Sequence, residues 1–280
     1  MPRRSNRYRA HTRQLAHYAA LIMIAALMLL PIYLNVVNAV SPPKYRFAYP
    51  PALWPKEPTG AAFALAIRRG SMLRFLWNST VVSVLITAGQ SATSCLAAYA
   101  CTFLQFPGRR IVFWTVVATS VVPFEAIVLG NFRTVLQLGW LNSYPALVVP
   151  FLGSGLGVFL LSRAFRALPA DLLEAAQLDG CGHLRILCRI VAPLARPTIA
   201  ALAVLSFLGA WSQYLWPLIV TTRSSRRTVQ IGIAQLAGGE LNSFTVLSAG
   251  SIIVVIPLAI ILIAFQKQLV RGLSAGLADG

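Results

Sequence analysis

Long apolar runs separated by short polar segments dominate this chain. No ionised side chain occurs from Phe75 to Gly108, from Pro197 to Thr222 or from Leu241 to Gln266. A transmembrane helix needs roughly 20 mainly apolar residues, and the alternating pattern of membrane β-barrels is missing. The sequence therefore predicts an all-α polytopic membrane protein with about six transmembrane helices, over 15–40, 76–103, 111–132, 143–162, 198–221 and 244–266.

The composition agrees with a membrane protein. Of 280 residues, 57% are hydrophobic and 11% are charged, and the mean hydropathy is +0.71, which is more apolar surface than a soluble domain could bury. The first apolar stretch is longer than that of a signal peptide and has no small-residue cleavage site, so we expect it to be retained. The expected segments are a basic head (1–14), a first transmembrane helix (15–40), an external Pro-rich loop (41–75), a core domain of five transmembrane helices (76–266) and a tail (267–280).

The distribution of Lys and Arg favours one orientation in the membrane. With six spans, 14 of the 24 basic residues fall on the side of the amino terminus and 10 on the other. Cytoplasmic loops carry the excess of basic residues, so both termini and the loop at 163–197 are expected in the cytoplasm. The net charge of +17 is spread over loops on both sides. It therefore indicates contact with anionic lipid head groups and not nucleic-acid binding.

The four cysteines do not have the spacing of a metal site. Cys95 and Cys101 lie in an apolar stretch, Cys181 and Cys188 lie in the polar loop, and no C-x-x-C pair occurs. We expect these side chains to pack as small hydrophobic groups. No metal-binding or cofactor-binding residue is predicted.

A short polar segment between two apolar runs contains three of the seven Asp and Glu residues, namely Asp171, Glu174 and Asp179. Pro169 suits the start of a helix, Asp171 lies where a negative charge meets the positive helix end, and Gly180 suits a left-handed helix end. A helix over 169–179 is therefore expected, followed by a second over 182–192 and a bend at two prolines. The residues alone leave two interpretations open, an amphipathic interfacial loop and a docking site for a partner protein.

The polar segment also carries a recognisable motif, Glu174-Ala175-Ala176 followed by Asp179-Gly180, with Pro193 and Pro197 downstream. Other matching features are Asn78-Ser79, Ala98-Tyr99-Ala100, Leu138-Gly139 with Leu141-Asn142-Ser143, Phe165-Arg166-Ala167-Leu168-Pro169, Pro217-Leu218 and the tail Phe265-Gln266-Lys267. Over roughly 70–275 the chain resembles the inner-membrane permease subunits of binding-protein-dependent ABC sugar importers, of the maltose and glycerol-phosphate type. It is most similar to the smaller, maltose-type second permease.

The resemblance implies a set of partners and a coupling site. A second, different permease would complete the translocation path, two ATPase subunits would bind ATP on the cytoplasmic side, and an extracytoplasmic solute-binding protein would deliver the solute. The loop at 166–197 would be the coupling loop of this inner-membrane protein. Its predicted ATPase-coupling residues are Pro169, Asp171, Glu174, Ala175, Ala176, Asp179, Gly180, Pro193 and Pro197.

The fifth apolar stretch departs from the family pattern near the expected channel. The family's Trp-Asn-acidic triplet is here Trp211-Ser212-Gln213, so the identity of the solute does not carry over. Polar and aromatic groups of sugar-binding character make Trp211, Ser212, Gln213 and Tyr214 candidates for the solute path, although aromatic packing at the membrane interface explains them equally. Glu125 is a further candidate, unless it lies at the outer interface or pairs with Arg133.

The sequence argues against a catalytic role for this chain. The phosphate-binding pattern G-x-x-x-x-G-K-[ST] does not surround any of the three lysines, and no protease or hydrolase motif occurs. His11, His17 and His183 are too scattered to form an intramembrane catalytic group. The alternatives left open are an ABC permease for a non-sugar solute such as a peptide, phosphate or a metal, an intramembrane enzyme, and a non-catalytic membrane scaffold.

Overall fold

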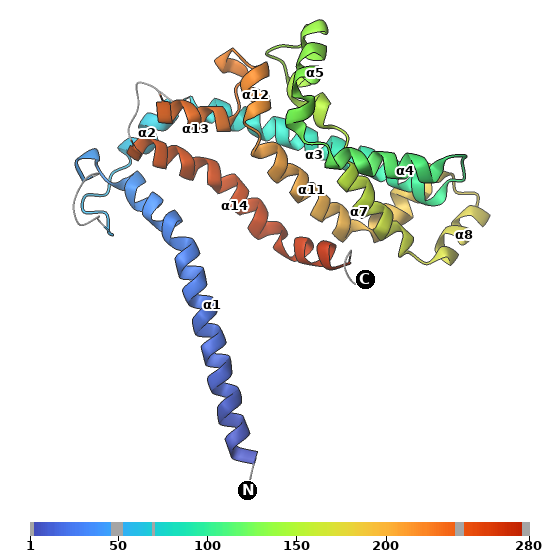
Figure 1. Ribbon diagram of the computed structural model, residues 1–280, viewed down its shortest axis with the longest axis horizontal. Helices are drawn as coiled ribbons and strands as arrows, with labels where there is room; N and C mark the ends of the chain where they lie inside the picture. Colours follow the sequence, from blue (N-terminus) through green and yellow to red (C-terminus); the bar gives the residue numbers. More distant parts are fainter. Residues whose placement is uncertain (1–2, 46–52, 69–70, 239–243, 276–280) are drawn as a thin grey trace. The chain divides into compact units, whose positions relative to one another are not determined.

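The computed structural model describes residues 3–45, 53–68, 71–238 and 244–275, which form helices and turns with no strand within these ranges (Figure 1). The chain divides into two compact units. Unit 1 comprises residues 1–70 and 235–253, and unit 2 comprises residues 71–234 and 254–280. The fold is all-α, as the sequence predicts.

Unit 1 contains the amino-terminal helix α1 (Arg3–Val40), the short turn η1 (Pro43–Tyr45) and α2 (Ala61–Arg68). The large apolar side chains of α1 between Leu15 and Ile32 are exposed, as expected for a helix whose solvent is lipid. Its last turn meets the following loop, because the Thr59 N–H donates to the Val40 carbonyl. An ion pair between Lys44 and Glu57 closes the loop, with 2.6 Å between Nζ and Oε2.

Unit 2 is built around the long helix α3 (Met72–Phe103), which packs against α7 (Gly155–Arg166) and α11 (Arg196–Trp211) (Figure 1). The helices approach closely at Gly157, where a Cβ would overlap the Ser94 hydroxyl and lie 3.1 Å from Leu202. Gly153 has open space around it and makes no such contact. The small residues Gly157 and Ser94 therefore let α7 pack closely on α3.

Further helices and helical turns complete unit 2. They are α4 (Arg109–Ala118), η2 (Thr119–Val121), α5 (Phe124–Gln137), α6 (Tyr144–Val148), η3 (Val149–Phe151), α8 (Ala170–Leu178), α9 (His183–Ile186), η4 (Leu187–Val191), α10 (Ala192–Leu194), α12 (Leu215–Val220) and η5 (Ser224–Arg226), together with parts of α13 (Val229–Gly238) and α14 (Phe244–Ala275).

Three described helices are long and apolar enough to cross a membrane: His17–Val40, Met72–Phe103 and Phe244–Val270. Three bent pairs raise the number to six if each pair is one span. These pairs are Arg109–Val121 with Phe124–Gln137, bent by 100°, Tyr144–Phe151 with Gly155–Arg166, bent by 48°, and His183–Leu194 with Arg196–Trp211, bent by 84°. The predicted spans 15–40, 76–103 and 244–266 each correspond to one continuous helix, and 111–132 and 143–162 correspond to bent pairs. The third bent pair overlaps the predicted span 198–221 only through Arg196–Trp211.

The breaks correct the expectation of uninterrupted helices over 111–132, 143–162 and 198–221. Pro123 disfavours helical geometry in the residue before it, and Val122 is accordingly extended, with a ψ of 117°. The helix in the fifth predicted span ends at Trp211, and a separate helix, α12, begins at Leu215. This break falls at the polar residues Ser212 and Gln213 inside an uncharged run, so the absence of charge alone could not locate it.

Candidate functional site

The predicted docking helix is present as α8, one residue shorter at each end than expected. Pro169 occupies the N-cap position and Asp171 lies in the first turn, where a carboxylate stabilises the exposed N–H groups and the positive helix end. Proline fits here because its missing N–H would have no partner inside the helix.

The end of α8 is a Schellman turn centred on Gly180. Gly180 has a φ of +74°, its N–H donates to the Gln177 carbonyl, and the N–H of Cys181 donates to the Ala176 carbonyl, each over 3.0 Å. These two bonds satisfy carbonyls that the helix end would leave unpaired. A side chain at Gly180 would be strained in this conformation, which gives the predicted glycine a defined structural role.

One face of α8 is held by unit 2 and the other is open. Leu173 is half-buried and Ala176 is buried. Leu172 and Gln177 are exposed. The outer face of α8, as defined here, consists of Asp171, Glu174, Ala175 and Leu178 at helical spacing together with Asp179, and all five residues are exposed.

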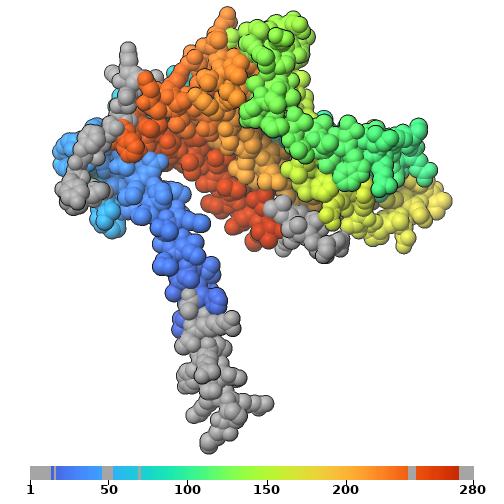
Figure 2. All heavy atoms as spheres, viewed as in Figure 1, coloured from blue at the N-terminus to red at the C-terminus, as the bar shows by residue number. Residues whose placement is uncertain are grey.

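The outer face of α8 combines acidic and apolar groups. Its three carboxylates form no ion pair within the described part of the chain, and the Leu178 side chain is 89% exposed. Figure 2 shows the yellow α8 segment open on the viewed face at one end of unit 2. An exposed leucine beside unpaired carboxylates is suited to contact with another protein surface.

The residues after α8 form the helix expected over 182–192, which runs from His183 to Leu194 and supports α8. It comprises α9, the π-helical turn η4 and α10. The π-helical turn has a local cause, since Pro193 cannot donate a hydrogen bond and its ring would clash with the Arg189 carbonyl four residues earlier. The helical hydrogen bonds widen there, and the Ala192 N–H donates to the Leu187 carbonyl. Pro197 then opens α11 beyond the 84° bend.

A buried cluster ties this support to the long helices. It contains Ala98 and Tyr99 of α3, Leu161 and Phe165 of α7, Ala176 of α8, Ile186, Leu187, Val191, Ala195, and Leu202 of α11. The Tyr99 hydroxyl also lies 3.1 Å from Nδ1 of His183 in α9. A force applied to α8 would therefore reach three membrane helices through packed side chains.

The opposite end of α3 holds the segment 221–228 in place. Asn78 Nδ2 donates to the carbonyls of Ser225 and Arg227, at 3.0 and 2.9 Å, and Tyr144 donates its hydroxyl to Asn78 Oδ1 at 2.8 Å. The Arg226 guanidinium lies over the Tyr144 ring, 4.4 Å from its centroid. The arginines of this segment are thus presented on a fixed backbone.

Asn142 fixes the start of the same segment. Its Oδ1 accepts the N–H groups of Thr222 and Arg223, each over 2.8 Å, and its own N–H donates to the Val220 carbonyl. The residue adopts a φ of +60°, a left-handed conformation that asparagine tolerates better than most residues. The link joins the turn after α5 to the chain after α12.

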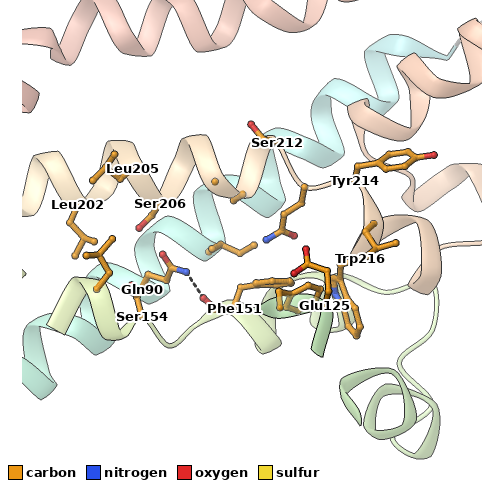
Figure 3. A pocket seen from close by; sticks show the side chains of 17 residues that line it. Gln90, Glu125, Phe151, Ser154, Leu202, Leu205, Ser206, Ser212, Tyr214 and Trp216 are labelled. Atoms are coloured by element: carbon orange, nitrogen blue, oxygen red, sulfur yellow. Dashed lines mark hydrogen bonds between the residues drawn. The ribbon is translucent and has the colours of Figure 1, made fainter. Parts of the chain in front are cut away.

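A cavity of about 570 Å³ opens in unit 2 where α11 ends, between residues of α3, α5 and α12 (Figure 3). Its wall is rigid on one side, where the Trp216 ring meets Phe124 edge-on at 5.7 Å and its Nε1 donates to the Ala146 carbonyl. Gln90 donates to the Phe151 carbonyl at 2.7 Å. The polar side chains around the cavity are Gln90, Glu125, Ser154, Ser206, Ser212 and Gln213.

The predicted path residues differ in their relation to this cavity. Glu125 lines it and points into it (Figure 3), and Gln213 contributes a buried Oε1 that has no hydrogen-bond partner. Ser212 and Tyr214 also line it, although the Tyr214 ring extends away from its centre in Figure 3. Trp211 is not among the lining residues, because it is buried and stacks on Phe207 with 5.5 Å between ring centroids.

Glu125 has no ion pair with Arg133 in the described ranges. It lies in the first turn of α5, where the positive helix end favours a carboxylate. Its side chain is exposed, and it is the only charged group lining the cavity.

Comparison with known proteins identifies the chain's relatives. Residues 90–275 match the family described as "Binding-protein-dependent transport system inner membrane component". The chain belongs to this family. One relative is the sn-glycerol-3-phosphate transport system permease protein UgpE of Brucella abortus (strain 2308). The two chains are 34% identical over 205 residues, which cover 72% of this chain and 73% of the relative. This chain is 36% identical over 200 residues, 71% of each chain, to UgpE of Yersinia enterocolitica.

Two solved structures share the fold of this binding-protein-dependent permease. One is a bacterial ABC transporter involved in the import of the acidic polysaccharide alginate, with a TM-score of 0.81 at 20% identity, covering 95% of this chain and 98% of that chain. The other is the alginate transporter in complex with an alginate pentasaccharide-bound periplasmic protein, with a TM-score of 0.66 at 17% identity and coverage of 94% and 97%. The chain is thus a multi-pass membrane permease subunit and not itself an enzyme.

The sequence did not predict the structural roles of some residues of this permease. Asn78 and Asn142 supported the resemblance, but their hydrogen bonds to 222–227 join positions far apart along the chain. A polar residue next to a turn, as at Gly139-Trp140-Leu141-Asn142, was the only local signal. The Tyr99–His183 contact had no local signal at all.

Proposed function

We propose that this chain is the permease subunit of an ATP-driven importer for a sugar or sugar derivative, working with a second, different permease and two ATPase subunits. The family membership and the sugar-phosphate and polysaccharide systems of its relatives support the solute class. The observation that carries the coupling role is the outer face of α8, whose acidic groups and exposed leucine sit on a rigid support.

In this proposal the outer face of α8 docks on an ATPase subunit. Asp171, Glu174 and Asp179 accept charge-assisted hydrogen bonds from the partner, and Leu178 fills an apolar recess. When the ATPases close on ATP, they push α8, and the buried cluster passes the movement to α3, α7 and α11. Rocking of such rigid helices about a central solute site switches a transporter between its inward-open and outward-open states.

The proposal assigns sides to the two ends of unit 2. Asn78 and Tyr99 are about 30 Å apart along α3 at 1.5 Å per residue, which is the thickness of the hydrocarbon core. With α8 and both termini in the cytoplasm of an inner-membrane protein, the segment 221–228 lies outside. Its arginines, Arg223, Arg226 and Arg227, then face the solute-binding protein.

The cavity at the end of α11 is proposed as this chain's half of the solute path. Hydroxyl and amide groups beside aromatic rings suit a polyhydroxylated solute. The lining residues include one carboxylate and no Lys or Arg, so an anionic solute would meet repulsion on the order of 1–4 kcal/mol from Glu125. We therefore propose an uncharged sugar or polyol as the solute, unlike the anions named for the relatives.

Co-purification tests the coupling proposal directly. The variant Asp179→Lys reverses a charge on the outer face and should lose the ATPase that the wild-type chain retains in detergent extracts. Asp179→Glu is the matched control, because it keeps the negative charge at the same position and should retain the ATPase. Retention of the ATPase by Asp179→Lys, or its absence from wild type, would count against the proposal.

A further inference from the structure

A second cavity, of about 430 Å³, lies between α4 and α7 at the end of unit 2 that carries α8. Its volume falls within the range of about 300–1,000 Å³ typical of small-molecule sites. The side chains around it are aromatic, hydroxyl and cationic. They include Phe113, Trp114, Phe159, Ser162, Arg163 and Arg166.

Both cations of this cavity lack an acidic partner. Arg163 and Arg166 lie in the last turn of α7, where three-residue spacing places them on one side of the helix. No carboxylate pairs with either arginine in the described part of the chain. Both side chains are exposed, so the pair is accessible to an anion from outside the chain.

Arg166 is also oriented by its surroundings. Its guanidinium carbon lies 5.4 Å from the centroid of the Phe113 ring. A guanidinium stacked on an aromatic face keeps its N–H donors at the edge available, and their planar fork matches phosphate oxygens.

A buried hydroxyl provides an independent indication of a ligand. Ser162 lines the cavity and is 1% exposed, and its Oγ has no hydrogen-bond partner among the residues that the structure describes. A buried hydroxyl without a partner is energetically unfavourable. An anionic oxygen in the cavity would accept this hydrogen bond together with those of the two arginines.

We propose that this cavity binds the phosphate head group of an anionic membrane lipid. The apolar surface beside it decides between a lipid and a free phosphate ion. Trp114 is 54% exposed and Ile111 is 73% exposed on the adjoining helix α4, which suits acyl chains. The two arginines lie at the end of the helix pair Tyr144–Phe151 with Gly155–Arg166, which is long and apolar enough to cross a membrane as one span. The end of a span is the depth at which lipid phosphates lie. This inference concerns the surrounding bilayer and does not depend on the proposed transport function.

Native mass spectrometry of the full-length chain, extracted together with its bound partners, tests the site. The probes are phosphatidylglycerol, phosphatidylcholine with the same acyl chains, and inorganic phosphate as a competitor. Wild type should bind phosphatidylglycerol at least about tenfold more tightly than phosphatidylcholine, since only the former carries a net charge for the arginines. Millimolar inorganic phosphate should not displace it.

The variants locate the site. The double variant R163Q/R166Q should weaken phosphatidylglycerol binding by about 10- to 100-fold, since it removes two charge-assisted contacts. The control R110Q/R196Q removes two exposed arginines at the same end of unit 2, outside the cavity, and should retain binding. Ser162→Ala removes only a hydroxyl and should weaken binding by about 3- to 10-fold, which tests the site even if the double variant fails to fold.

Three results would overturn the lipid site. Equal binding of phosphatidylglycerol by wild type, R163Q/R166Q and Ser162→Ala would exclude this cavity. Displacement of the lipid by millimolar inorganic phosphate would assign the cavity to a free anion. If R163Q/R166Q instead lost a co-purifying subunit and kept its lipid, the arginines would belong to a protein contact, and the proposal would fail.

Discussion

The hydroxyl of Tyr99 lies 3.1 Å from Nδ1 of His183, and this contact joins the membrane helix α3 to the support of α8. The two residues are 84 positions apart. The Tyr99 ring also packs against Phe103, with 5.2 Å between centroids. Tyrosine therefore contributes apolar packing and one polar link at the point where a displacement of α8 would enter the bundle.

We expect Tyr99→Phe to reduce coupling without unfolding the protein. The ring contact with Phe103 stays and one hydrogen bond is lost, worth about 0.5–1.5 kcal/mol. Uptake per ATP hydrolysed, measured in proteoliposomes, should fall by about 2- to 10-fold. The double variant Y99F/H183F should be no worse than the more affected single variant. Additive losses would show that the two side chains act independently.

Gly180→Ala should weaken coupling through the backbone. Alanine at a φ of +74° costs about 1–2 kcal/mol, so the turn that ends α8 would loosen and displace Asp179. The control is Gly182→Ala, because Gly182 has an ordinary φ of −70° and open space around its Cα. Transport should fall in the first variant only. Equal transport by the two variants would show that the turn at Gly180 is not needed for coupling.

Asn142→Ala should release the segment 221–228. It removes the acceptor for the Thr222 and Arg223 N–H groups and strains the left-handed backbone, for a combined cost of about 2–4 kcal/mol. Hydrogen exchange at these two amides should accelerate by at least about tenfold. Asn142→Gly relieves the strain but not the lost acceptor, and should give an intermediate rate. Unchanged protection in both variants would contradict the assigned role.

Glu125 should influence which solutes are carried. Glu125→Gln keeps the shape of the side chain and removes the only charge among the residues that line the cavity. Competition of anionic sugar phosphates against the transported sugar should then improve by about 5- to 100-fold, since repulsion on the order of 1–3 kcal/mol is removed. Glu125→Asp, which keeps the charge, is the control and should leave this competition unchanged. If anionic sugar phosphates compete equally well in wild type and Glu125→Gln, the solute path does not pass Glu125.

The Lys44–Glu57 pair makes the loop of unit 1 sensitive to pH. Hydrogen bonds from Lys44 and then Tyr45 lower the pKa of the Glu57 carboxyl below 4.5, and the hydrogen bond to Glu57 raises the pKa of Lys44 above 10.5. Between pH 4.5 and pH 10.5 both groups are charged, and the ion pair between Lys44 and Glu57 is fully formed. It is lost as the pH falls through the folded-state pKa of Glu57 or rises through that of Lys44. Proteolysis near residues 53–60 should accelerate in acid for wild type, while Glu57→Gln should be cleaved rapidly at all pH values.

The sequence predicted those features that depend on neighbouring residues. Uncharged runs located the membrane helices, and Pro169 and Gly180 located the two ends of α8 to within one residue, because capping depends on local backbone chemistry. The family pattern identified the class of protein. The position of Glu125 in a cavity was one of the alternatives that the residues left open.

The remaining features depend on packing between distant segments. The direction of Leu172 and Gln177 follows from which side of α8 meets the buried cluster, and helical spacing alone could not decide it. Trp211 turns inward because Phe207 offers a stacking surface one turn earlier. Helix α11 ends at Trp211, within the run from Pro197 to Thr222 that contains no charged residue. The absence of charge therefore predicted one continuous helix there.

Photo-cross-linking from position 178 tests the central claim most directly. A benzophenone amino acid replaces Leu178, which is 89% exposed on the outer face of α8, and in a second variant replaces Trp54, which is 74% exposed in unit 1. After irradiation of intact cells, position 178 should cross-link to an ATPase subunit and position 54 should not. Cross-linking of position 178 to lipid alone, or of both positions equally to the ATPase, would contradict the account.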